Sequence, residues 1–76
     1  MGIQVIVKTK AADNIETALG RIASECEIFP IDTENWGVSI PGKVIDVVGE
    51  QQVEAALEKL EHFDLWAGTW KSAKPR

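Results

Sequence analysis

The fold of this chain is decided by residues 2–26, which read GIQVIVKTKAADNIETALGRIASEC. At its start, Ile3, Val5 and Val7 alternate with Gln4 and Lys8, a pattern typical of a β-strand. Ile6, between Val5 and Val7, makes the second face of this strand partly apolar as well, and this predicts a central strand.

The rest of this stretch carries a helical pattern. Asp13 can cap a first turn while Glu16 reaches back, a variant of the capping box, and this predicts a helix over residues 13–26. Its apolar residues recur at the spacing of one buried helical face and are Ile15, Ala18, Leu19, Ile22, Ala23 and Cys26. Gly20 is the one misfit, because glycine in an exposed helix interior costs about 1 kcal/mol relative to alanine. The absence of a side chain there suggests close packing of another element.

Strand patterns return after this helix. Residues 27–31 contain Pro30, which favours an edge strand or a bulge, and the pattern leaves open whether they form a strand of their own or merge with the next one. Residues 36–40 and 43–48 alternate on either side of Pro41-Gly42 and predict a hairpin. The spacing then predicts a second helix over residues 50–62 and a last strand over residues 65–70.

This order predicts an α+β domain, a two-layer sandwich with two helices on one face of an antiparallel sheet. Two short right-handed crossovers would generate the split βαβ arrangement (βαββαβ) called ferredoxin-like. Residues 1–70 form one domain in this interpretation, and residues 71–76 form a mobile basic tail. Residues 43–70 resemble the second half of small regulatory domains of that architecture, and ACT-type sensing domains are similar in length and order.

The charge is distributed unevenly. The chain of 76 residues has a net charge of −4, but three of its eight basic residues fall in the last six positions, so residues 1–70 hold 12 acids against five bases, a net of −7. Nucleic-acid binding needs clustered Lys and Arg, and docking on anionic membranes needs the same, so this balance argues against both and favours basic partners. The apolar runs are also far too short to cross a bilayer.

Few residues of this chain are suited to catalysis or metal binding. One histidine and one cysteine cannot form a catalytic triad, a thiolate cluster or an intramolecular disulfide, so we expect no enzyme, no catalytic residue, no metal site and no cofactor. His62 is interpreted as a solvated residue in the last turn of the second helix, and Cys26 as a small core residue. A single cysteine and an N-terminus without a secretory pattern predict a cytoplasmic protein.

Two surfaces are candidates for partner binding. The first is an acidic ridge on the second helix, formed by Glu50, Glu54, Glu58 and Glu61, whose ordinary alternative is a solvated helix face. The second comprises the three tryptophans, Trp36, Trp66 and Trp70. Trp66 and Trp70 would share one side of the last strand, and Ile6, Val44 and Val48 could extend an apolar patch on the sheet face without helices. The alternative is that one or two of the rings close the core.

These features favour a small acidic, non-enzymatic binding module that acts through a protein partner or through self-association as a homodimer, of the adaptor or inhibitor type. The alternative is a dimeric regulatory domain of ACT-type architecture that senses a small ligand.

Overall fold

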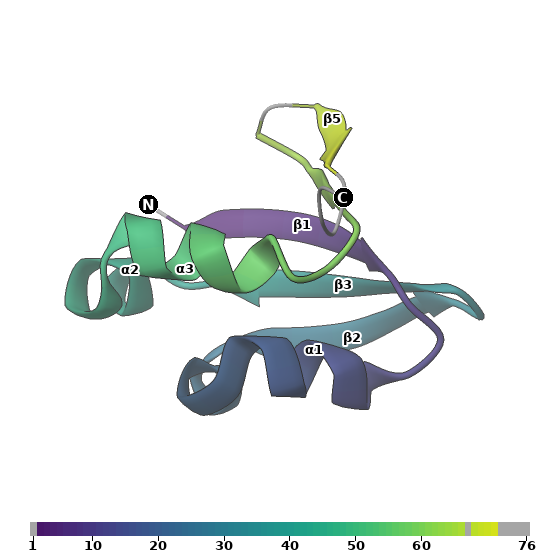
Figure 1. Cartoon of the computed structure of the whole chain (residues 1–76), viewed down its shortest axis with the longest axis horizontal. Helices are drawn as coiled ribbons and strands as arrows, with labels where there is room; N and C mark the ends of the chain where they lie inside the picture. The colour runs from purple at the N-terminus through teal and green to yellow at the C-terminus, as the bar shows by residue number, and fades with distance from the viewer. Residues whose placement is uncertain (1, 67, 72–76) are drawn as a thin grey trace.

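The computed structural model describes residues 2–66 and 68–71. Its elements in chain order are β1 (Ile3–Lys8), α1 (Ala12–Leu19), the 3-10 helix η1 (Gly20–Glu25), β2 (Glu27–Asp32), β3 (Asn35–Ile40), α2 (Gly42–Val48), α3 (Glu50–Leu57), β4 (His62–Asp64) and β5 (Thr69–Lys71). The strands form one antiparallel sheet in the order β2-β3-β1-β4-β5, and the helices pack on one of its faces (Figure 1). In this view β5 stands at the end of the sheet farthest from α1.

The core lies between the helices and this face of the sheet. Alternate residues of β1 and β3 point into it, among them Val5 and Val38, each 1% exposed. The remaining buried members of the cluster are Val7, Ile15, Leu19, Ile40, Val44, Val53 and Leu57. Because side chains on a strand alternate, the residues between these point to the opposite face, which we call the open face.

The first strand is confirmed, and β1 lies in the middle of the five strands. The predicted first helix is divided in two. Its N-cap is Ala11 rather than Asp13, and no side chain caps it. It ends at Leu19, and its C-cap Gly20, whose φ of 65° and ψ of −128° interrupt the α-helical hydrogen bonding, is the first residue of η1. A Cβ built at Gly20 would meet no atom within 4 Å, so the predicted close packing there is wrong.

The predicted hairpin over residues 36–48 is wrong. β3 pairs with β2 on one side and with β1 on the other, so neither of its edges is left for a strand at residues 43–48. These residues form α2 instead, with the extended Pro41 as N-cap and its carbonyl accepting hydrogen bonds from the backbone N–H groups of Val44 and Ile45, at 3.0 and 3.3 Å. Residues 27–31 do form their own edge strand, with a register shift between Pro30 and Asp32.

The end of the chain also differs from the prediction. The second helix stops at Leu57, with Glu58 as its C-cap, and the last strand is replaced by two short strands joined by a turn. Asp64 organises that turn, because its Oδ1 accepts the backbone N–H of Trp66 at 2.9 Å and its carbonyl accepts that of Gly68 at 2.6 Å. Gly68 has a φ of 70°, which favours glycine.

The protein is therefore a small α+β domain with one helical layer on an antiparallel sheet. The described residues form five strands, three α-helices and η1, so the predicted order of four strands and two helices is not reproduced element for element. The predicted tail begins at Lys71, the last residue of β5, and residues 72–76 lie outside the described residues. Within the described part of the chain, no helix combines the length and the apolar character needed to span a membrane.

Candidate functional site: the open face of the sheet

A row of apolar side chains crosses the open face from one edge of the sheet to the other. Ile6 points away from the core because its neighbours in β1 point into it, and the strand register places Gly37 and Phe63 directly beside it. Phe29 is in register with Gly37, and Trp70 with Phe63. The row therefore reads Phe29, Gly37, Ile6, Phe63, Trp70, with one residue from each strand, and we call it the aromatic row.

The rings at the two ends of the aromatic row are the accessible ones. Phe29 is 47% and Trp70 is 51% exposed, whereas Ile6 and Phe63 are half-buried. Trp70 packs edge-to-face on Phe63, with ring centroids 5.3 Å apart and planes at 60°. At the other end, a Cβ on Gly37 would overlap the ring of Phe29, so the absence of a side chain at Gly37 allows this ring to pack directly on β3.

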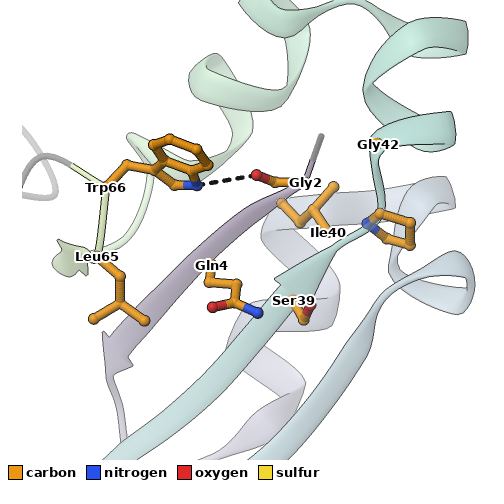
Figure 2. A pocket seen from close by; sticks show the side chains of 8 residues that line it. Gly2, Gln4, Ser39, Ile40, Gly42, Leu65 and Trp66 are labelled. Atoms are coloured by element: carbon orange, nitrogen blue, oxygen red, sulfur yellow. Dashed lines mark hydrogen bonds between the residues drawn. The ribbon is translucent and has the colours of Figure 1, made fainter.

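A hollow of about 540 Å³ adjoins the open face at the start of β1. Figure 2 shows Leu65, Gln4 and Ser39 side by side across the sheet, with the indole of Trp66 turned toward Gly2. The Nε1–H of Trp66 donates a hydrogen bond to the carbonyl of Gly2 at 3.0 Å, which ties the turn after β4 to the beginning of β1. Trp66 is nevertheless 60% exposed, so most of its ring remains available for contact.

The three tryptophans do not form one surface. Trp36 lies on the helical side, where it is in register with Val7 and packs against the core. Trp70 lies on the open face, and Trp66 lies in the turn between β4 and β5 rather than beside Trp70 on one strand. The predicted contributions of Val44 and Val48 to an apolar patch are wrong, because α2 turns the first into the core and packs the second against it.

The acidic ridge is shorter than predicted. Glu50 and Glu54 lie one turn apart on α3, but Glu58 is its C-cap and Glu61 lies beyond the helix, just before β4. All four side chains are exposed. The first two line a second hollow, of about 500 Å³, on the helical side of Trp66.

Sequence reasoning missed an acidic stretch around β2. Residues 25–34 contain four acidic residues and no Lys or Arg, and we call its exposed carboxylates the acidic edge: Glu25, Glu27, Asp32 and Glu34. Asp32 accepts the backbone N–H of Glu34 at 2.8 Å and the side-chain amide of Asn35 at 2.9 Å. These hydrogen bonds, the backbone one first, hold the pKa of Asp32 below its usual range. The charge count of this stretch was the signal that could have revealed it.

The single histidine and the single cysteine of the chain lie on the helical side and not on the open face. His62 is 3% exposed, in β4, and its ring Nδ1–H donates to the carbonyl of Leu60 at 2.9 Å, so its predicted position in a solvated helical turn is wrong. The Cys26 thiol donates to the carbonyl of Ile22 at 3.2 Å, and burial, followed by the charge of Glu25, raises the pKa of this thiol. Across residues 2–66 and 68–71, no group of three or more His, Cys, Asp or Glu side chains is placed to hold a metal ion.

No family model, no curated protein and no solved structure matches this chain.

Proposed function

We propose that this chain is a small, acidic, non-enzymatic binding module that acts through protein–protein contact on the open face of its sheet. The observation that carries this proposal is the aromatic row, because its register places rings from both edges of the sheet on the face that carries no helix in the described part of the chain. Aromatic side chains are enriched at the centres of protein interfaces, where they account for much of the binding energy.

The exposed area is consistent with a binding surface. A fully buried aromatic side chain covers about 150–250 Å², so Phe29 and Trp70, each about half exposed, present roughly 200 Å² of ring surface together. Leu65, 47% exposed, and Ile6 extend this surface between them. The largest apolar patch on a typical soluble monomer, about 300–600 Å², is often a functional surface.

The proposal includes a cytoplasmic setting and no cofactor. A ferredoxin-like plan for the first four strands is also part of it, supported by their order β2-β3-β1-β4 and by helices in the connections from β1 to β2 and from β3 to β4. The second candidate is a dimeric small-molecule sensor of ACT-type architecture. It is favoured by the hollow beside Trp66, which borders the open face and would be closed by a second copy packed on that face.

The test changes the ends of the aromatic row. A Phe29→Ser/Trp70→Ser variant and a Val47→Ser control are used as baits in a pull-down from cells, with identification of the captured proteins by mass spectrometry. Val47 is 85% exposed on α2, so the control removes an apolar side chain from the helical side of the molecule. Circular dichroism verifies that each bait is folded.

We expect the unchanged chain and the control to retain the same partner and the double variant to lose it. A folded double variant that captures the same proteins would refute the open face as the binding surface. A thermal-shift screen with amino acids and nucleotides tests the second candidate, because a compound that binds the folded state raises the melting temperature.

A further inference from the structure

We propose that the partner meets this module with a positively charged surface, whose Lys or Arg side chains contact the acidic edge while its apolar side chains cover the aromatic row. This inference rests on the proposed function and names the chemistry of the partner. Its basis is the acidic edge itself, in which four exposed carboxylates and no basic residue occupy residues 25–34.

The acidic edge frames the exposed apolar side chains of β2. Glu27 and Phe29 point to the same side of the strand, about 7 Å apart along it, because alternate residues share a face. Asp32 and Glu34 lie at the far end, where β2 passes into β3. Phe29 and Ile31, 47% and 48% exposed, therefore lie between carboxylates at both ends of the strand. A surface with apolar side chains flanked by cations complements this arrangement.

The outer edge of β2 is not built to accept another strand. Pro30 has no backbone N–H, and the register of β2 shifts between Pro30 and Asp32. Charged residues, proline and bulges are the devices by which edge strands avoid pairing with other chains. The partner is therefore expected to contact side chains of β2 and the open face rather than extend the sheet.

The negative charge also favours a basic partner over a second copy of this chain. Residues 1–70 carry a net charge of −7, so two copies packed through this face would bring like charges together. Lys8 is a basic residue on the open face, at the end of β1 in register with Asn35. Asp32 is in register with the same asparagine on its other side, so Lys8 would repel a cationic partner at this end of the acidic edge.

The experiment uses a library of random twelve-residue peptides, selected on the full chain and counter-selected on the Phe29→Ser/Trp70→Ser variant. We expect the selected peptides to be enriched in Lys and Arg and depleted in Asp and Glu. Their affinities are then measured by fluorescence anisotropy at 50 and 300 mM NaCl, and binding should weaken with salt because exposed charges are screened.

Two triple variants with the same change in net charge localise the effect. Glu25→Gln/Glu27→Gln/Glu34→Gln removes charge from the acidic edge and spares Asp32, which supports the turn. Glu50→Gln/Glu54→Gln/Glu58→Gln is the matched control on and beside α3. We expect roughly tenfold weaker binding for the first, since each exposed ion pair contributes a factor of about two, and less than a threefold change for the control. Lys8→Gln should strengthen binding.

Four results would overturn the inference. Selected peptides without a basic bias, or equal losses from the two triple variants, would refute the charge argument but leave the open face as a binding surface. A dimer in light scattering that the Phe29→Ser/Trp70→Ser variant abolishes would identify a second copy as the occupant. If no peptide distinguishes the full chain from that variant, the proposed function itself fails together with the inference.

Discussion

Replacing Gly20 with L-alanine is expected to destabilise the protein. Gly20 is exposed and closes α1, with its backbone N–H bonded to the carbonyl of Glu16. Its φ of 65° with ψ of −128° is a conformation that L-residues rarely adopt. Because a Cβ there meets nothing within 4 Å, the substitution introduces backbone strain and no steric contact.

The expected magnitude follows from two opposing effects. Strain at a residue in such a conformation costs about 1–3 kcal/mol. Alanine also restricts the unfolded chain, which offsets about 0.4–1 kcal/mol of that cost. The middle of each range gives a net loss of unfolding free energy of about 1–2 kcal/mol, against a total of roughly 4–11 kcal/mol for a chain of this length. The melting temperature should fall by about 4–16 °C.

The assay is urea and thermal unfolding followed by circular dichroism, with a synthetic chain carrying D-alanine at position 20 as the matched control. D-alanine adopts a positive φ without strain, so this chain should be as stable as the unchanged protein or slightly more stable. An L-alanine variant that is stabilised by about 1 kcal/mol would mean that residues 13–25 form one continuous helix. Equal effects of the two alanines would show that backbone handedness at Gly20 is not the cause.

Three further outcomes are expected. Trp66→Phe keeps a ring but removes the hydrogen bond to Gly2, so the unfolding free energy in urea should fall by roughly 0.5–1 kcal/mol, and no loss would mean that this bond does not stabilise the turn. The pKa of Asp32, measured by carbon NMR, should lie below that of an unfolded aspartate. The hydrogen bonds of Asp32 then stabilise the turn between β2 and β3 at pH values above the unfolded pKa, and this stabilisation is lost as the pH falls through the folded pKa. A raised pKa would contradict the turn geometry. Cys26 should react with a disulfide reagent at pH 8 more slowly than free cysteine because burial raises the pKa of its thiol, and a rate equal to that of free cysteine would mean that the thiol is exposed.

The error over α2 has a specific physical origin. Val44, Ile45, Val47 and Val48 fit an alternating pattern and a helical pattern equally well over so few residues, as short apolar runs often do. Residues 43–48 cannot pair with β3 as a strand, because both edges of β3 are paired with other strands. That occupancy depends on pairings with β1 and β2, which no local pattern contains.

The open face shows the same division. Sequence patterns predicted that a sheet face would remain uncovered and that Ile6 would lie on it, and the structure places Ile6 there. The three tryptophans could not be assigned to faces in the same way, because their orientation depends on where each strand begins. Phe29 and Phe63 were missed, since they join the aromatic row only through registers with distant strands.

The sequence by itself determined an α+β chain with a central first strand, amphipathic helices and an acidic body. These are properties of consecutive residues, because periodicity and local charge depend only on neighbouring positions in the sequence. Only the tertiary structure decided that residues 42–48 are helical, that Trp36 faces the core, and that one residue from each of five strands forms a continuous row. The reason is that cross-strand register is set by long-range pairing and core burial, and a shift of one residue would turn each side chain to the other face.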